Sequence, residues 1–300
     1  MEPAILHGLG TALVTPFHSG GEVDFSSLTA LVHAQIAAGV NFLVPCGSTG
    51  EASTLSEDET DAVVRAVVES AAGRVPILVG CTHNATSEAV RRAVHLSQID
   101  GVYGILSANP YYNKPSQQGQ YLHFKAIAEA IVKPLLLYNI PGRTAANLLP
   151  ETVLRLAELS NVIGIKESSG NLQQIGELLA NAPDTFSVFA GDDYLALPII
   201  AAGGKGLISV ASNAVPAQVL QLVTAELAHD QGAARHHARN LHELMKALFV
   251  EPNPAPVKAL LDMMGAMECD ALRLPMLPVS EGTRDQLRAA AKLCGLQLQA

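Results

Sequence analysis

The stretch VIGIKESSG, residues 162–170, is a short apolar run that carries a lysine near its end. It predicts a buried strand, because a strand that is covered on both faces has apolar side chains throughout. Burial disfavours the charged form of an amine, so Lys166 is a candidate for an uncharged nucleophile that attacks carbonyl carbon. The alternative is a lysine that has left the strand and either reaches solvent or pairs with Glu167.

Similar apolar runs occur on both sides of this stretch, and most segments between them show helical spacing. Ser56 and Glu59 form a capping box, Pro150 opens a helix, and Gly39 and Gly73 stand where helices end. Apolar strands that alternate with helices predict an α/β fold with a parallel sheet, and eight such units close a (β/α)8 TIM barrel. A doubly wound open sheet remains possible, because periodicity does not show closure. The predicted strands are residues 9–14, 42–46, 77–81, 102–106, 135–140, 162–166, 186–190 and 206–210.

The pattern becomes wholly helical after the eighth run. This predicts a catalytic barrel domain of residues 1–217 and a C-terminal helical domain of residues 218–300. The turn-rich EPNPAP, residues 251–256, separates helices of this extension. We find no internal repeat and no low-complexity tract.

Composition excludes several classes of protein. The 300 residues are 49% hydrophobic with a net charge of -9 and no basic cluster, which argues against nucleic-acid and anionic-membrane partners. Cys46, Cys81, Cys269 and Cys294 lack CxxC spacing and are expected to be reduced. The first ten residues lack a basic signal region, and the apolar runs are interrupted before membrane-spanning length. We therefore expect a soluble cytoplasmic protein.

Polar motifs follow several of the predicted strands. In a barrel the C-terminal strand ends meet on one face, where catalytic groups gather. Each motif alone has an ordinary reading, such as a glycine turn or a surface charge, but together they supply a lysine, hydroxyl groups and a cation, as carbonyl condensation requires. GGKG, residues 203–206, precedes its strand and is read as structural. The motifs are GSTGE (47–51), NPYYNKP (109–115), YNIPGRT (138–144) and GDD (191–193).

These motifs, with GIKES, AGDD, GLISV, EPNPAPVK and RLPMLP, resemble those of the dihydrodipicolinate synthase family. The family lies within the pyruvate-dependent Schiff-base aldolases, which include N-acetylneuraminate lyase. The resemblance covers nearly the whole chain, and it implies a barrel with a helical C-terminal domain and a homotetramer, a dimer of dimers. It also implies a lyase of diaminopimelate and L-lysine biosynthesis that condenses pyruvate with L-aspartate 4-semialdehyde to give 4-hydroxy-tetrahydrodipicolinate.

The resemblance also implies roles for individual residues. The imine would form on Lys166, so no organic cofactor is expected, and the absence of HxH and HExxH spacing predicts no metal site. A hydroxyl relay would move protons, with Tyr112 reaching in from a neighbouring subunit. The implied catalytic residues are Lys166, Tyr138, Tyr112 and Ser48, and the implied substrate-binding residues are Thr49, Arg143, Gly191 and the backbone carbonyl of Ile208.

Two departures from the family pattern matter. Ser48 stands where the synthases commonly have threonine, and GSTGE is the usual spelling in neuraminate lyases, whereas Arg143 favours a synthase because it can grip a small carboxylate. Three residues match a site at which L-lysine inhibits many synthases, but two positions that hold histidine in some lysine-sensitive enzymes differ here. The matching residues are Asn84, Glu88 and Tyr111, and the differing ones are Glu57 and Thr60.

Two other functions stay open at this stage. One is another pyruvate-dependent aldolase or dehydratase, such as an N-acetylneuraminate or 2-keto-3-deoxy sugar acid lyase. The other is a barrel without catalytic activity that binds a keto acid, although such a protein would have no use for a hydroxyl relay.

Overall fold

The structure, a computed structural model, describes residues 6–299 and contains the eight predicted strands. Strand boundaries differ from the predicted ones by one to two residues at most ends. The strands are β1 Gly8–Ala12, β2 Phe42–Val44, β3 Leu78–Gly80, β4 Gly104–Ala108, β5 Leu135–Asn139, β6 Val162–Glu167, β7 Ser187–Ala190 and β8 Gly206–Ser209.

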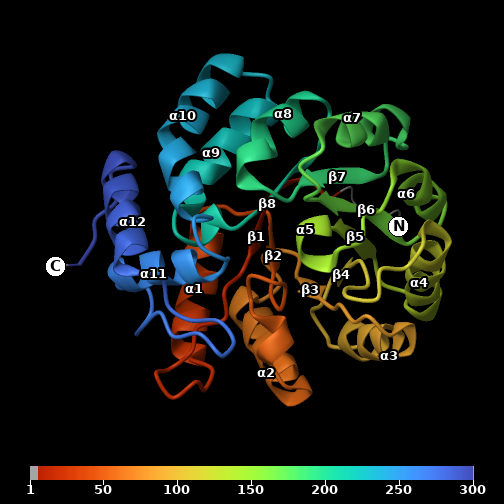
Figure 1. The fold of residues 1–300 in the computed structure, drawn as a ribbon, viewed down its shortest axis with the longest axis horizontal. Coiled ribbons are helices and arrows are strands. Elements are labelled where there is room, and N and C mark those ends of the chain that lie inside the picture. The colour runs from red at the N-terminus through yellow and green to blue at the C-terminus, as the bar shows by residue number, and fades with distance from the viewer. Residues whose placement is uncertain (1–5, 300) are drawn as a thin grey trace.

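Helices follow the strands in chain order and surround them (Figure 1). Those of the barrel units are α1 Phe25–Ala37, α2 Glu57–Ala71, α3 Thr86–Ser97, α4 Gln117–Ala130, α5 Pro141–Thr144, α6 Pro150–Ala157, α7 Leu172–Asn181, α8 Ala196–Ala201 and α9 Pro216–Leu227. After them come α10 Gln231–Ala247, α11 Ala255–Met263 and α12 Glu281–Leu293. Short 3-10 helices are η1 Ala52–Thr54, η2 Asp193–Leu195 and η3 Ala211–Asn213.

The sheet closes into a barrel. The strand order is β2-β1-β8-β7-β6-β5-β4-β3, and the paired strands run parallel. A parallel bridge between Leu43 and Ile77 joins the two ends of this order, and the Leu43 N–H donates to the Pro76 carbonyl at 3.0 Å. The predicted TIM barrel is therefore confirmed, and the open doubly wound sheet is wrong.

Local signals in the sequence set the helix ends. Ser56 and Glu59 form both bonds of the capping box at the start of α2, and Pro150 is the first residue of α6. Gly39 and Gly73 follow α1 and α2 with φ of 87° and 71°, a left-handed conformation that a glycine adopts without strain. These predictions are confirmed.

Side chains that alternate along each strand divide the core into two layers. Leu136 and Tyr138 of β5 belong to the cluster inside the barrel, whereas Leu135 and Leu137 pack against the surrounding helices. Inside the barrel, the rings of Phe42 and Phe189 meet edge to face with centroids 5.4 Å apart. Full burial of a large apolar side chain contributes about 1.5–3 kcal/mol, so both layers stabilise the closed sheet.

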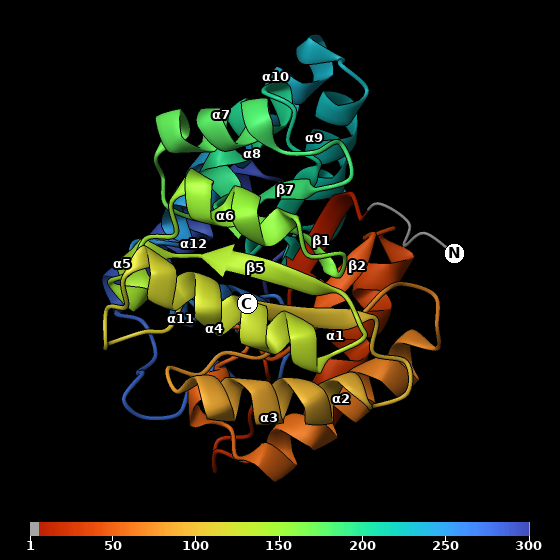
Figure 2. The same cartoon turned by 90° about the vertical axis from the view of Figure 1, so that its right-hand side faces the viewer.

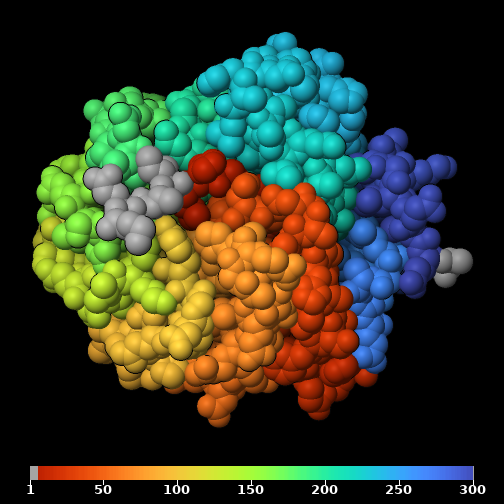
Figure 3. All heavy atoms as spheres, turned by 180° about the vertical axis from the view of Figure 1, so that it is seen from behind, coloured from red at the N-terminus to blue at the C-terminus, as the bar shows by residue number. Residues whose placement is uncertain are grey.

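The C-terminal helices lie along one flank of the barrel. Figure 3 shows the last C-terminal helices in blue beside the red and orange N-terminal units. Helix α5 lies at the arrowhead of β5 (Figure 2). Helix α9 follows β8 and packs against β1 and β8, so it completes the eighth barrel unit. The predicted boundary between residues 217 and 218 lies inside α9. On packing grounds the barrel therefore extends to the end of this helix, while the two-domain division itself stays a prediction.

None of the helices in residues 6–299 combines the length and the apolar character that crossing a bilayer requires.

Candidate active site

Lys166 lies near the C-terminal end of β6, between Tyr138 of β5 and Phe189 of β7 in the strand register. Its side chain points into the barrel and is 4% exposed. The amine nitrogen Nζ lies 4.5 Å from the ring centroid of Tyr138. Lys166 therefore has not left the strand, and the solvent-exposed alternative is wrong.

Glu167, the next residue, points to the opposite face of the sheet because side chains alternate along a strand. Asn139 Nδ2 donates to both of its carboxylate oxygens, at 3.2 and 3.0 Å, and the Ser169 N–H donates to Oε1 at 2.6 Å. Burial raises the pKa of the Glu167 carboxyl, and these hydrogen bonds act in the opposite direction. Glu167 thus ties the ends of β5 and β6 together and does not pair with Lys166.

The GSTGE turn follows β2 and presents two neighbouring hydroxyl groups. Hydrogen bonds from the Gly50 N–H to the Gly47 carbonyl and from the Glu51 N–H to the Ser48 carbonyl close the turn. Ser48 is exposed, whereas Thr49 is buried. Glu51 has a φ of 53°, and a residue other than glycine in this left-handed region costs about 1–3 kcal/mol, so other contacts must hold the turn.

A buried ion pair supplies such contacts. Nζ of Lys258 in α11 donates to Glu51 Oε1 at 2.7 Å and to the Thr15 carbonyl at 2.9 Å. The two side chains are 0% and 3% exposed, and the Lys258 amine lies 4.2 Å from the ring centroid of Phe17. Burial lowers the pKa of Lys258, and the Glu51 carboxylate acts in the opposite direction. Sequence analysis missed this pair, although a lysine inside the apolar APVKALLDM is an unusual signal.

Most of the predicted site residues line one cavity of about 480 Å³ at the C-terminal end of the strands. Gly191 lies against the lysine, because a Cβ atom at this position would stand 2.9 Å from both Cε and Cγ of Lys166. That Cβ atom would also stand 2.0 Å from Ser168 Oγ, so any side chain at this position would displace Ser168 or the stem of Lys166. The predicted residues in the lining are Ser48, Thr49, Tyr138, Arg143, Lys166 and Gly191.

Arg143 lies on the short helix α5 and is exposed, and its side chain is bound by a residue of the C-terminal extension. Its Nη2 donates to the Asn253 carbonyl at 2.8 Å. Asn253 also lines the cavity, and its side-chain amide Nδ2 donates to Thr49 Oγ1 at 2.9 Å. Sequence analysis did not single out Asn253, because it noted EPNPAP only as a break between helices.

Two predicted site residues lie outside this cavity. Tyr112 is 86% exposed with a φ of 75°, and it does not line the described cavities. Ile208 is fully buried inside the barrel, so it is Val210, two residues further on, that reaches the cavity. The predicted role of the Ile208 backbone carbonyl at the pocket stays a prediction.

A neighbouring cavity of about 520 Å³ shares Ser48, Tyr138 and Arg143 with the first and extends to Tyr111. Asn84 and Glu88, the other residues matched to a lysine site, do not line it. Arg91 Nε donates to Glu88 Oε2 at 2.9 Å, and Arg91 Nη1 donates to Glu57 Oε2 at 3.1 Å. The Glu88 carboxylate is therefore already paired with Arg91 of the same chain.

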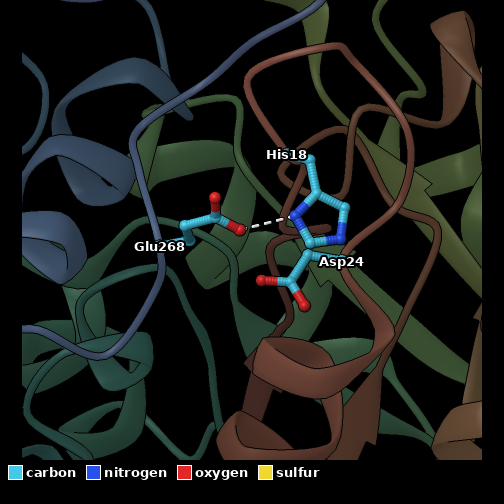
Figure 4. Close-up of side chains that lie close together, drawn as sticks. All are labelled: His18, Asp24 and Glu268. Atoms are coloured by element: carbon cyan, nitrogen blue, oxygen red, sulfur yellow. Dashed lines mark hydrogen bonds and ion pairs between the residues drawn. The ribbon is translucent and has the colours of Figure 1, made fainter.

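Within residues 6–299, the side chains of His18, Asp24 and Glu268 form one group whose potential metal-ligand atoms lie within 4.8 Å of one another (Figure 4). His18 Nδ1 lies 2.6 Å from Glu268 Oε2, and this hydrogen bond raises the pKa of His18. Asp24 caps helix α1 by accepting from the Ser27 N–H at 2.9 Å. An ion pair and a helix cap account for this group.

The fold and the cavity together define a class: a (β/α)8 barrel with a buried lysine among hydroxyl groups and an arginine. The sequence profile described as the Dihydrodipicolinate synthetase family matches residues 5–293. The chain belongs to this family, as its motifs predicted, and is an enzyme of the lyase class.

Individual relatives agree with this assignment. The chain is 53% identical to 4-hydroxy-tetrahydrodipicolinate synthase of Koribacter versatilis, over 97% of each chain. It is 52% identical to the protein of the same name from Acidobacterium capsulatum, over 98% of this chain and 97% of the relative. The dihydrodipicolinate synthase of Aquifex aeolicus superposes with a TM-score of 0.95 at 40% identity, over 98% of this chain and 100% of that chain. A monomeric dihydrodipicolinate synthase variant gives a TM-score of 0.96 at 40% identity, over 99% of each chain.

Proposed function

We propose that the protein catalyses the condensation of pyruvate with L-aspartate 4-semialdehyde to 4-hydroxy-tetrahydrodipicolinate, a step of diaminopimelate and L-lysine biosynthesis. The observation that carries the proposal is the buried Lys166 amine in a cavity that it shares with Tyr138 and Arg143. Relatives more than half identical over nearly their full length carry the name of this activity.

The first step is attack of the Lys166 amine on the ketone carbon of pyruvate. Loss of water gives an imine, and loss of a proton from the methyl group gives an enamine that adds to the aldehyde carbon. The amino group of the semialdehyde then attacks the imine carbon, so that the ring C–N bond forms, the C–N bond to Lys166 breaks and the lysine amine is released. The protonated imine is the electron sink, so the proposed reaction requires neither an organic cofactor nor a metal.

Hydroxyl groups move the protons in this scheme. Tyr138, whose ring lies against the lysine amine, and Ser48 on the GSTGE turn share the cavity with Lys166. The backbone and hydroxyl donors of Ser48 and Thr49 hold the carboxylate of pyruvate, and Arg143 holds the carboxylate of the semialdehyde.

Tyr112 completes the relay from a neighbouring subunit. The proposed assembly is a homotetramer, a dimer of dimers, and its proposed location is the cytoplasm. The high exposure of Tyr112 supports an intersubunit role, and so does the fact that it does not line the cavity of its own chain. A second copy would thus supply a hydroxyl group that the cavity lacks. No nucleic acid and no membrane takes part in the proposed function, in keeping with the net charge of -9.

Borohydride reduction tests the proposal directly. Incubation with pyruvate and borohydride should label one peptide, the one that contains Lys166, and pyruvate with the semialdehyde should turn over. Labelling at a different lysine would contradict the assignment of the nucleophile. Imine formation without turnover of the semialdehyde would favour a different aldolase, and the absence of both would favour a keto-acid-binding barrel.

The other pyruvate-dependent aldolases are distinguished by Arg143→Ala. We expect this change to raise KM for the semialdehyde by about thirtyfold, because a charge-assisted pair with a carboxylate is lost. Imine formation with pyruvate should be retained, as measured by borohydride trapping. An unchanged KM for the semialdehyde would count against a synthase that grips its second substrate with this guanidinium.

Inhibition by L-lysine at Asn84, Glu88 and Tyr111 is a further proposal, and the structure favours a weak effect. The Glu88 carboxylate, which would pair with an incoming ammonium group, already accepts from Arg91. Initial rates with millimolar L-lysine test this proposal. An unchanged rate would discard regulation at these residues.

A further inference from the structure

Asn253 contacts both Thr49 and Arg143. The proposed reaction assigns the carboxylate of pyruvate to Thr49 and the carboxylate of the semialdehyde to Arg143. Asn253 precedes α11 in the EPNPAPVK segment and is 6% exposed. Its side-chain Nδ2 donates to Thr49 Oγ1 at 2.9 Å, and its backbone carbonyl accepts from Arg143 Nη2 at 2.8 Å. One residue therefore contacts the pyruvate side of the cavity through its side chain and the semialdehyde side through its backbone.

The direction of the hydrogen bond to Thr49 fixes what that hydroxyl group can do. An amide N–H only donates, so the Thr49 oxygen acts as the acceptor in this contact. The single hydroxyl proton of Thr49 is then left for another acceptor, and among residues 6–299 no side-chain or backbone acceptor contacts it by a hydrogen bond. A carboxylate in the cavity, which only accepts, matches this free donor.

We propose that Asn253 is a positioning residue that turns the Thr49 hydroxyl proton toward the carboxylate of the keto acid, while its backbone carbonyl holds Arg143. The inference rests on the proposed function. The rest of the segment supports it, because Lys258 at the other end of EPNPAPVK is bonded to Glu51 on the same turn as Thr49. The segment is thus fixed to the GSTGE turn at two places.

Steady-state kinetics of two variants test the inference. Asn253→Ala should raise KM for pyruvate about tenfold, since a hydrogen bond from an oriented hydroxyl to a charged group is weakened. It should leave KM for the semialdehyde unchanged, because alanine retains the backbone carbonyl that holds Arg143. Asn253→Leu should raise KM for pyruvate as much as Asn253→Ala does. Leucine branches at the same carbon as asparagine but donates no hydrogen bond, so it fills the position without orienting the Thr49 hydroxyl.

The comparison of the two variants separates positioning from a structural role. Leucine nearly preserves the shape of asparagine, so a residue needed only for packing would tolerate Asn253→Leu better than Asn253→Ala. That result, or equal effects of Asn253→Ala on both KM values, would overturn the inference. Should Asn253→Ala fail to fold, Asn253→Ser takes its place in the comparison.

Two controls complete the design. In a Thr49→Val background, Asn253→Ala should have no further effect on KM for pyruvate, whereas an undiminished effect would contradict action through Thr49. Asn161 donates to the Ala128 and Ile131 carbonyls at 2.8 and 3.0 Å next to the start of β6, so Asn161→Ala should leave both KM values unchanged. If wild-type protein forms no imine with pyruvate, the proposed function fails. If it does and Asn253→Leu keeps the wild-type KM for pyruvate, only this inference fails.

Discussion

Lys166→Ala is expected to abolish borohydride trapping of pyruvate and to lower kcat by about a thousandfold, which corresponds to about 4 kcal/mol of activation free energy. The amine is the one protein atom in the scheme that bonds covalently to the keto acid, and a protonated imine is a far better electron sink than a carbonyl group. Mass mapping after reduction and a steady-state assay with both substrates measure the two effects. The fold should be retained, because the change shortens a side chain at the rim of the barrel interior.

Lys205 offers a matched control for this variant. It belongs to the GGKG motif and directly precedes β8, at the opposite end of the strands from the cavity. Lys205→Ala should therefore leave trapping and kcat unchanged. Turnover by Lys166→Ala at the wild-type rate would show that another group acts as the nucleophile.

Lys258→Met should lower the free energy of unfolding by about 3–5 kcal/mol, because it leaves the carboxylate of Glu51 buried without its partner. Methionine fills most of the same volume, so the loss of stability measures the effect of the unpaired charge and not the effect of a cavity. The same change should weaken pyruvate binding, since Glu51 shares a turn with Ser48 and Thr49. Urea unfolding and KM for pyruvate are the measurements.

The exposed pair of Arg91 and Glu57 is the control for burial. Its side chains are 51% and 52% exposed, and such pairs contribute about 0–1 kcal/mol, so Arg91→Ala should change stability little. Replacing Glu51 and Lys258 together with apolar residues should recover much of the stability lost in Lys258→Met. If Lys258→Met and Arg91→Ala lowered the free energy of unfolding equally, the greater contribution assigned to the buried ion pair would be refuted.

The sequence predicted those parts of the molecule that depend on neighbouring residues. Apolar runs located all eight strands, and the capping box of Ser56 and Glu59 located the start of α2. Strand ends were less accurate because pairing with neighbours sets them. Residues 102–106 were predicted as a strand, but β4 is Gly104–Ala108, where it pairs with β3 and β5.

The candidate site was predicted in part for the same reason. Lys166, Ser48 and Arg143 lie directly in motifs at strand ends, where the barrel brings them to one face. The contacts of Asn253 with Thr49 and of Lys258 with Glu51 join residues 204 and 207 positions apart. Periodicity carries no information about such distant pairs, so the partners of Asn253 and Lys258 became visible only in three dimensions.

The attachment of the EPNPAPVK segment to the GSTGE turn has a consequence for protein engineering. A hybrid that joins this barrel to the C-terminal helices of another family member exchanges one wall of the cavity together with those helices. The pocket forms in such a chimera only when the two parents are compatible at both contacts. Thr49 must then match Asn253, and Glu51 must match Lys258. A single crossover anywhere between Glu51 and Asn253 separates both pairs of partners, so recombination in this fold is least disruptive before Thr49 or after Lys258.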